Sequence, residues 1–401
     1  MRRLIAVTLA AALAGSGCSA PILANGPIVF PTPEAATPAP SRPTDPAPIL
    51  FPRDDGPHDR LTEWWYYTGH LHTDDGRKFG FEAVVFRAER GSVPTAWASH
   101  LALTDEQGAT FHYAQRSEIG PQVDHSPRDG AGRPTGFDLQ VGGLSPLLID
   151  AGAPASAPPW RLAGSGGTDR IEASLTPDEA RLAGASFGLQ LDLQSSKPPA
   201  LHDGDGFVDF GPAGSSYYYS RTRLGASGTL VLDGVPMAVE GIAWFDHQWG
   251  DFVSVGGGGW DWFAINLSDG TDVTVSVVRD VAGHPVLAYG TAVDAQGKAT
   301  HLEESQFSIV ASGSWPSPRS GNTYAVNWSV TFPLALPGGP QIVQLTPTVF
   351  DQELDTRATT GVAYWEGSQR VTVSYPERAL VVQEAGEAYV EMTRYDAGSG
   401  G

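Results

Sequence analysis

Short segments with alternating polar and apolar side chains recur along most of this sequence, and they constrain the fold more than any other feature. Val273 to Val278 alternates with a period of two, which is the pattern of a strand with one buried face. Pairs such as Asp75-Gly76, Asp233-Gly234 and Asp269-Gly270 favour hairpin turns between such segments. Few stretches show helical spacing, and the chain contains 48 glycines and 32 prolines. The sequence therefore predicts an all-β protein.

Strand signals lie on both sides of a glycine-containing stretch near residue 228. They cover residues 64–72, 79–87, 97–104, 137–141, 187–193 and 217–224 before it, and 273–278, 324–332, 341–345 and 371–374 after it. A chain of 401 residues is long enough for two domains with separate cores. Because closing a sheet removes its exposed edges, we predict two antiparallel β-barrel domains, over residues 56–228 and 229–401.

The N-terminus has the features of a secretion signal. Arg2-Arg3 precede an apolar segment, Leu4 to Leu13, that is too short to span a bilayer. Small residues then lead to Cys18, the single cysteine, in a pattern similar to a bacterial lipobox, although Gly15 stands where that motif usually has leucine. We predict a lipoprotein signal peptide over residues 1–18, lipid attachment at Cys18 and export to the cell envelope. A chance cysteine in an ordinary signal peptide is the alternative.

The segment after the predicted signal peptide is rich in proline, alanine and threonine. We predict that residues 19–55 form an extended tether between the lipid anchor and the folded body. The formal net charge is −20, and loss of Arg2 and Arg3 with the signal peptide gives −20 − 2 = −22. A chain this acidic is repelled by phosphate backbones, so we expect no nucleic-acid partner.

The segment from Glu63 to Tyr67 combines one carboxyl group with four aromatic rings. On a strand, Glu63, Trp65 and Tyr67 share one face. A carboxyl group among indole rings loses hydration, which raises its pKa and makes Glu63 a candidate proton donor. Trp65 and Tyr67 are then candidates for ligand binding. The alternative is a strand that packs its aromatic rings into a core, with Glu63 as a structural hydrogen-bond acceptor.

A second group of aromatic and titratable residues lies further along the chain. Its catalytic candidates are Asp246, His247 and Asp261, and its candidate ligand-binding walls are Trp244, Trp249, Trp260 and Trp262. We expect the three catalytic candidates to line one cavity walled by Trp249 and Trp260, because a hairpin closed by the glycines at 256–259 would join the two segments. One aspartate would remain protonated as an acid, and His247 would orient water. The alternative is a bent strand pair whose indoles fill a barrel.

Two further tyrosines, Tyr217 and Tyr219, occupy alternate positions of another aromatic segment and are candidates for ligand binding, although half-buried strand aromatics are the alternative. His70 and His72 have strand spacing that suits two ligands of one metal ion, but no third ligand is identifiable from the sequence. We therefore predict no metal site. The sequence has no P-loop, dinucleotide-binding glycine motif or G-x-S-x-G nucleophile elbow, and we expect no cofactor.

Six motifs in a fixed order make the sequence similar to a known family. They are Glu63-Trp64-Trp65-Tyr66-Tyr67-Thr68-Gly69-His70-Leu71, Tyr217-Tyr218-Tyr219-Ser220-x-Thr222-Arg223-Leu224, Gly241-x-Ala243-Trp244-x-Asp246-His247-Gln248-Trp249-Gly250, Trp260-Asp261-Trp262-Phe263, Tyr364-Trp365-Glu366-Gly367 and Gly386-x-x-Tyr389-Val390-Glu391-Met392-Thr393. The series resembles the lipocalin-like family of AttH-like exported proteins and carotenoid 1,2-hydratases (hydroxyneurosporene synthases), and is closer to the exported branch. The resemblance implies two lipocalin-like (calycin) β-domains with a ligand site between or within them.

Three functions remain open at this point. The first is a cofactor-independent hydratase or isomerase acting on a C=C bond of an isoprenoid or similar lipid, as the resemblance implies. The second is a non-catalytic periplasmic lipid carrier. The third is a secreted hydrolase, which ranks lowest because no nucleophile constellation is visible. The expected partners are a hydrophobic small molecule and, through the lipid anchor, a membrane.

Overall fold

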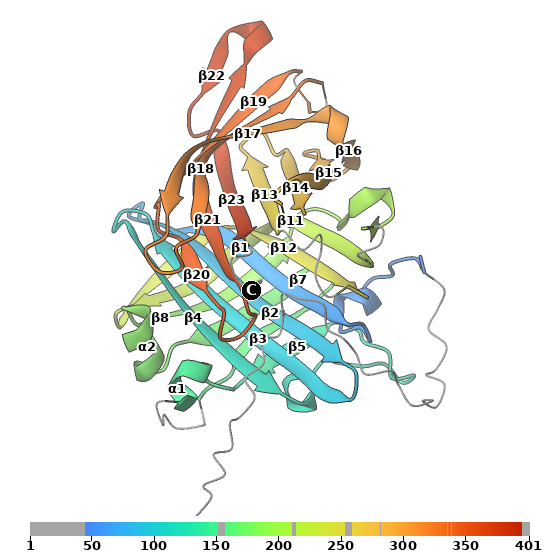
Figure 1. The fold of residues 1–401 in the computed structure, drawn as a ribbon, viewed down its shortest axis with the longest axis vertical. Coiled ribbons are helices and arrows are strands. Elements are labelled where there is room, and N and C mark those ends of the chain that lie inside the picture. Colours follow the sequence, from blue (N-terminus) through green and yellow to red (C-terminus); the bar gives the residue numbers. More distant parts are fainter. Residues whose placement is uncertain are drawn as a thin grey trace, which may run out of the picture.

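The computed structural model describes residues 45–150, 157–210, 214–252, 259–280, 282–334, 336–337 and 339–394, and these residues form an almost entirely β protein (Figure 1). The α-helices in this part of the chain are α1 (Pro146–Asp150) and α2 (Pro177–Ala183). Among the described residues, no helix combines the length and apolarity needed to cross a bilayer. The predicted all-β class is confirmed. The signal peptide, Cys18 and most of the predicted tether lie outside the described residues.

The first sheet is antiparallel and has the strand order β4-β3-β2-β1-β12-β11-β8-β7-β6-β5, with β9 and β10 paired to β11. Its strands are β1 (Thr62–His72), β2 (Lys78–Arg90), β3 (Val93–Asp105), β4 (Thr110–Ile119), β5 (Phe137–Val141), β6 (Trp160–Ser165), β7 (Thr168–Ser174), β8 (Phe187–Ser195), β9 (Ala200–Leu201), β10 (Phe207–Asp209), β11 (Ser215–Leu232) and β12 (Val235–Gly250). The end strands β4 and β5 contact one another, so the sheet curls into an open barrel.

The second sheet is also antiparallel and has the order β16-β15-β14-β13-β23-β21-β19-β18-β17, with β20 and β22 paired to β21. Its strands are β13 (Trp260–Leu267), β14 (Asp272–Arg279), β15 (Pro285–Val293), β16 (Ala299–Glu303), β17 (Ser308–Pro316), β18 (Thr323–Phe332), β19 (Gln341–Pro347), β20 (Glu353–Asp355), β21 (Ala363–Tyr375), β22 (Leu380–Val382) and β23 (Gly386–Arg394). The two large antiparallel sheets agree with the predicted pair of lipocalin-like domains.

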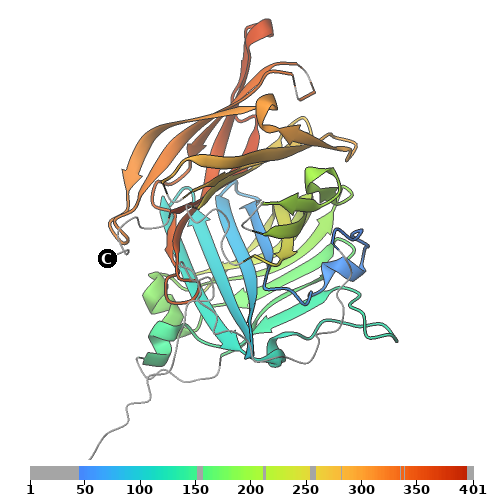
Figure 2. The same ribbon diagram turned by 45° about the vertical axis from the view of Figure 1, so that its right-hand side comes forward.

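The two curled sheets are stacked, with the second sheet above the first in Figures 1 and 2. Strands β21 and β23 reach down onto β1 and β2. Because β1 is covered on both faces, consecutive side chains along it are buried, instead of every second one. The strand from Thr62 to His72 therefore contributes to two compartments at once.

Hydrophobic side chains form a core inside each sheet and a smaller core between the sheets. Inside the first sheet lie Trp65, Tyr67, Phe137, Phe245 and Trp249, among others. Inside the second lie Phe263, Val275, Trp328, Val343 and Trp365, among others. Between the sheets lie Tyr66, Val84, Trp244, Trp262, Ala264 and Tyr389. The core between the two sheets therefore contains residues of the aromatic sequence motifs, such as Tyr66, Trp244 and Trp262.

The change from the first sheet to the second falls after Gly250, later than the predicted junction near residue 228. Gly228 lies inside β11, where it pairs with Leu191 of β8 and Val239 of β12. A Cβ atom at Gly228 would lie 2.0 Å from the Gln190 carbonyl oxygen. This glycine therefore allows close strand contact and does not mark a linker. The hairpin turn predicted at Asp233-Gly234 does join β11 to β12.

The folded body begins earlier than the end of the predicted tether. Asp55 is fully buried and accepts hydrogen bonds from Tyr219 Oη at 2.6 Å and from Arg221 Nη2 at 2.8 Å. Residues 45–55 thus pack against the first sheet, held by a buried carboxylate that the composition of the segment does not reveal.

Candidate functional site

Strand β12 sends neighbouring side chains to two different compartments. Asp246 and Trp244 face the second sheet, whereas His247 lies inside the first sheet against Trp65 at a ring-centroid distance of 4.7 Å. This follows from the two-residue period of a strand. Strands β12 and β13 also belong to different sheets and do not pair. The predicted hairpin does not form, and Asp246 and His247 do not line one cavity.

A group of carboxyl and phenol side chains lies between the two sheets, and we call it the junction cluster. Its members are Glu82, Asp246, Glu366, Glu391, Tyr66, Tyr218 and Tyr364, contributed by β1, β2, β11, β12, β21 and β23. Among the described residues, no lysine or arginine is paired with any of these four carboxyl groups. A buried carboxyl group without a cation is expensive to ionise, so this cluster favours neutral acids.

Asp246 is held by hydrogen bonds to both of its oxygens. Tyr218 Oη donates to Oδ2 at 2.5 Å, Trp244 Nε1 donates to Oδ1 at 2.6 Å, and the Ser220 hydroxyl also donates to Oδ1. Trp262 Nε1 in turn donates to Tyr218 Oη at 3.1 Å, which links β13 of the second sheet to this group. Asp246 is therefore fixed in place beside two of the predicted walls, Trp244 and Trp262.

Glu366 and Glu82 are each held by one oxygen only. Tyr66 Oη donates to Glu366 Oε1 at 2.6 Å, and Tyr364 Oη donates to Glu82 Oε1 at 2.7 Å. The Oε2 atoms of both glutamates are buried and have no hydrogen-bond partner among the described residues. Each glutamate thus has one oxygen free for a proton and for a ligand atom.

Burial controls the ionisation of the junction cluster. It raises the pKa of Glu82 to about 8 and that of Glu391 to about 8. Burial and the nearby charges of Glu391 and Glu82 raise the pKa of Glu366 well above its ordinary value. For Asp246, burial raises the pKa to about 6, although hydrogen bonds from Ser220, Tyr218 and Trp244 oppose the shift. At neutral pH the glutamates are protonated, while Asp246 is mostly ionised.

One side of the junction cluster is partly open to solvent. Glu391 is partly exposed, and so are Trp64, Phe86 and Trp260, which pack against the core between the sheets. The Trp260 ring N–H also hydrogen bonds to Glu391. The partly exposed surroundings of the junction cluster are thus largely aromatic.

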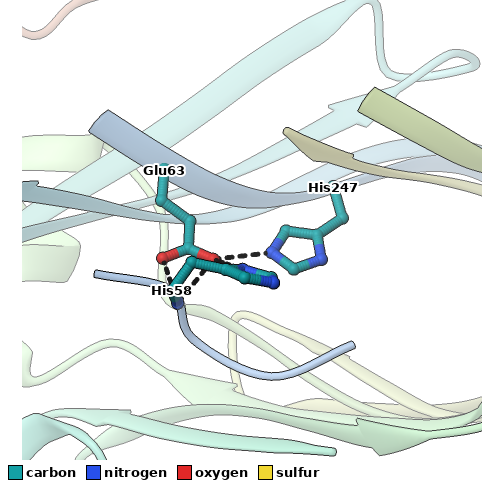
Figure 3. Close-up of side chains that lie close together, drawn as sticks. All are labelled: His58, Glu63 and His247. Carbon is teal, nitrogen blue, oxygen red and sulfur yellow. Dashed lines mark hydrogen bonds and ion pairs between the residues drawn. The ribbon is translucent and has the colours of Figure 1, made fainter. Parts of the chain in front are cut away.

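A separate polar group lies inside the first sheet. His58 Nδ1 is 2.7 Å from Glu63 Oε1, and His247 Nε2 is 3.0 Å from the same oxygen (Figure 3). His58 precedes β1, and its ring stacks on Trp249 with a centroid distance of 4.0 Å. We call His58, Glu63 and His247 the barrel triad.

The predicted role of Glu63 as a proton donor does not fit its surroundings. Burial alone would raise its pKa, but the charge of His58 and the hydrogen bonds from His247 and His58 lower it to about 2. Glu63 is thus a carboxylate at neutral pH, with no proton to give.

Asp261 also lies away from the predicted cavity. It shares the face of Phe263 toward the core of the second sheet, and Arg279 donates to its Oδ2 from Nε at 2.9 Å and from Nη2 at 2.6 Å. Its neighbours Trp260 and Trp262 point to the opposite face, toward the junction. The ion pair with Arg279 makes Asp261 a structural anchor of the second sheet.

The remaining candidate residues lie in the first sheet. Trp65 Nε1 donates to the Asp55 carbonyl at 2.9 Å, Tyr67 Oη donates to Asp169 Oδ2 at 2.9 Å, and Tyr219 Oη bonds Asp55. Tyr217 and Trp249 line a pocket of about 670 Å³ at the mouth of this sheet. The other lining residues are Asp45, Ala47, Pro48, Ile49, Leu50, Arg53, Asp54, Pro57, His58, Asp59, Arg60, Arg133 and Pro134.

Comparison with known proteins identifies the family. The family model described as AttH-like matches residues 42–395. The chain belongs to the AttH-like family. A solved AttH protein of Nitrosomonas europaea is 29% identical, with a TM-score of 0.69, over 87% of this chain and 98% of that chain. Kievitone hydratase of Nectria haematococca is 14% identical, with a TM-score of 0.61, over 87% of this chain and 94% of that one, and shares the fold. A comparison with curated proteins found no match.

The glutamates of this AttH-like junction cluster were not among the sequence candidates. Glu82, Glu366 and Glu391 come from strands far apart in the chain, and the contact between the sheets brings them together. One signal was available in the sequence: each of these glutamates directly follows an apolar or aromatic residue, as in Phe81-Glu82, Trp365-Glu366 and Val390-Glu391. Burying a carboxyl group is costly, so a glutamate in a buried strand is a candidate functional residue.

Proposed function

We propose that this AttH-like protein binds an unsaturated isoprenoid or similar lipid at the junction cluster and adds water to one of its C=C bonds. One observation carries the proposal: Glu82 and Glu366 are buried without a cationic partner among the described residues, and each has an oxygen without a hydrogen-bond partner. A neutral carboxylic acid in this state has a proton to transfer and no competing acceptor. The shared fold of a protein named kievitone hydratase supports the same class of reaction.

The reaction follows from the chemistry of an alkene beside a neutral acid. Glu366 transfers its proton to one alkene carbon, so that its O–H bond breaks, a C–H bond forms and the more substituted carbon becomes a cation. Water adds to that cation through a new C–O bond, and the surplus proton of the water returns to the Glu366 carboxylate. The net change is addition of one water molecule, and the acid is restored.

The surrounding groups suit a short-lived cation. Trp244 and Trp262 lie edge to face with a centroid distance of 6.2 Å, and Tyr66 lies edge to face with Trp262 at 5.4 Å. Aromatic faces attract positive charge, especially where water is excluded. Asp246, mostly ionised and fixed through both oxygens, would stabilise the cation electrostatically without reorienting. We therefore assign it an electrostatic role and assign the proton transfer to Glu366.

A non-catalytic lipid carrier is the second candidate, and the pocket at the mouth of the first sheet favours it. Pro48, Ile49, Leu50 and Trp249 give that pocket an apolar wall. The interior of the sheet itself is filled by aromatic rings, as the stacking of Phe137 on Phe245 shows. A carrier would thus use the pocket and not the barrel interior.

We also propose that the protein is exported and anchored through a lipid on Cys18, because the lone cysteine follows a short apolar segment. Replacing Cys18 with alanine should release the protein from the membrane fraction while the parent protein stays bound. A variant that fractionates with membranes as the parent does would contradict the anchor.

The activity is tested by incubating the purified protein with squalene or lycopene in isotopically labelled water. Mass spectrometry should detect a product heavier by one water molecule that carries the labelled oxygen. Ligand that co-purifies with the native protein should be identified by the same method. Tight binding of the isoprenoid without label incorporation would favour the carrier and reject the hydratase.

A further inference from the structure

We propose that the barrel triad, His58, Glu63 and His247, binds one divalent transition-metal ion of the zinc type. The three residues offer two imidazole nitrogens and one carboxylate oxygen, and these atoms all lie within 4.8 Å of one another (Figure 3). Two histidines and one carboxylate are a donor set that zinc prefers. The site is separate from the junction cluster, which lies on the other face of β1 and β12.

The spacing of the donor atoms fits a metal ion after a small adjustment. Both nitrogens now point at the same oxygen, Glu63 Oε1, at 2.7 Å for His58 Nδ1 and 3.0 Å for His247 Nε2. Zinc bonds of about 2.0–2.1 Å in a tetrahedral arrangement separate ligand atoms by roughly 3.3 Å. Each nitrogen would move away from Oε1 by about 0.3–0.6 Å to reach this separation, and all three donor atoms already lie within 4.8 Å of one another. A metal ion would replace the two protons in the hydrogen bonds that His58 Nδ1 and His247 Nε2 form with Glu63 Oε1.

The imidazole rings are already held for this role. His247 stacks on Trp65 at a centroid distance of 4.7 Å, and His58 stacks on Trp249 at 4.0 Å. Ligands that are fixed before binding lose little conformational entropy when the metal arrives.

The outer contacts of the two histidines also point to a ligand. His58 Nε2 lies 3.4 Å from Asp54 Oδ1, and a carboxylate behind a ligating imidazole is the usual second partner of such a histidine. His247 Nδ1 is fully buried and has no hydrogen-bond partner among the described residues. The nitrogen that faces Glu63 is Nε2, so the metal would bind His247 through Nε2.

Charge and access are both compatible with a cation. Arg87 Nη1 approaches the other oxygen, Glu63 Oε2, at 3.8 Å, and it is itself paired with Glu89. Asp54 and Asp55 also lie near the triad, and each is ion-paired with an arginine, Arg53 and Arg221. His58 lines the pocket of about 670 Å³, which gives a metal ion a route from solvent.

A metal ion at this position would join the segment before β1 to strands β1 and β12. His58 comes from that segment, which also carries the buried Asp54 and Asp55, while Glu63 and His247 lie on the paired strands β1 and β12, two residues apart in register. Binding to the folded protein alone raises its stability by mass action. The ion would thus stabilise the contact between the segment before β1 and the first sheet.

The test uses the full-length protein, purified without a histidine tag and stripped with a chelator. Titration with Co²⁺ should give one equivalent of binding with the visible absorption of a tetrahedral nitrogen–oxygen site, and Zn²⁺ should displace it. Zinc should also raise Tm by about 4 °C or more. Absence of the Co²⁺ spectrum in the parent protein would overturn the proposal without any variant.

Variants locate the site. His58→Gln, in a segment outside the strands, should weaken Co²⁺ binding by at least about 100-fold, and Glu63→Gln should do the same. His72→Gln, whose side chain is 48% exposed in the parent, is the matched control and should bind as the parent does. Equal binding in His58→Gln, Glu63→Gln and the parent would place the metal elsewhere and overturn the assignment.

Discussion

Asp246 and His247 are neighbours in β12, yet Asp246 Oδ2 bonds Tyr218 between the two sheets while His247 Nε2 contacts Glu63 Oε1 inside the first sheet. One strand therefore serves two sites with opposite electrostatics. On the junction side, the buried glutamates lack cations and stay neutral; on the barrel side, Glu63 is ionised beside histidines. Substitutions at these two adjacent positions should consequently affect different properties of the protein.

The neutral acids make stability depend on pH. Burial raises the pKa of Glu82 from 4.5 to about 8, so between these values the folded protein keeps a proton that the unfolded chain releases. The contribution of Glu82 is fully present below about pH 4.5 and is lost as pH rises toward 8, at no more than about 1.4 kcal/mol per pH unit. Urea denaturation at several pH values should show the free energy of unfolding falling over this window.

The matched variants for this effect are Glu82→Gln and Glu303→Gln. Glutamine does not titrate, so Glu82→Gln should give a shallower pH slope than the parent. Glu303, with a side chain that is 73% exposed, should give the parental slope when replaced. A parental slope in Glu82→Gln would show that this carboxyl group is ionised in the folded protein.

Asp272 is predicted to be the strongest electrostatic anchor between the two sheets. It is fully buried in β14 and accepts from Lys197 Nζ at 2.7 Å and from Arg223 Nη2 at 2.5 Å, both of which belong to the part of the chain that forms the first sheet. Asp272→Asn leaves these two cations without their counter-charge and should lower the free energy of unfolding by about 3 kcal/mol.

The control for this anchor is Asp192→Asn. Asp192 forms an exposed pair with Arg170, and such pairs contribute about 0–1 kcal/mol. Chemical denaturation measures both variants under one set of conditions. Equal, small losses for the two would mean that Asp272 does not hold the sheets together.

The sequence predicted the strands and the family well, because alternation and turn residues are local signals. It correctly placed Trp65 and Tyr67 on the same face of one strand, and both side chains lie in the core inside the first sheet. The two-residue period of a strand puts Asp246 and His247 on opposite faces of β12, and the expected hairpin wrongly placed both in one cavity. Which face meets which compartment could not be read from the sequence. Glu82 and Glu366 were missed because their meeting depends on how two separate sheets stack, which no local pattern encodes.

Gly80 sets how closely the two sheets approach beside the junction cluster. A Cβ atom at this position of β2 would lie 2.4 Å from Tyr389 Oη and 2.9 Å from Ser368 Cβ. Gly80→Ala should therefore push β21 and β23 outward, lower stability by about 1–3 kcal/mol and weaken isoprenoid binding.

The comparison variant is Gly130→Ala, where a Cβ atom meets no atom within 4 Å. It should leave both stability and binding at parental values, measured by thermal unfolding and by quenching of tryptophan fluorescence. Tight parental binding by Gly80→Ala would show that the ligand does not lie between the sheets.

Glu366 is assigned as the group that supplies the proton for hydration, and the turnover of Glu366→Gln measures whether it does. Because the acid is neutral at pH 7, glutamine keeps its charge and nearly its shape while removing the transferable proton. In Glu366→Gln, label incorporation from water into squalene or lycopene should fall by at least about 100-fold, while isoprenoid quenching of tryptophan fluorescence should be retained. Glu240→Gln, at a side chain that is 70% exposed, should turn over as the parent does. Parental turnover by Glu366→Gln would show that Glu366 does not supply the proton for hydration.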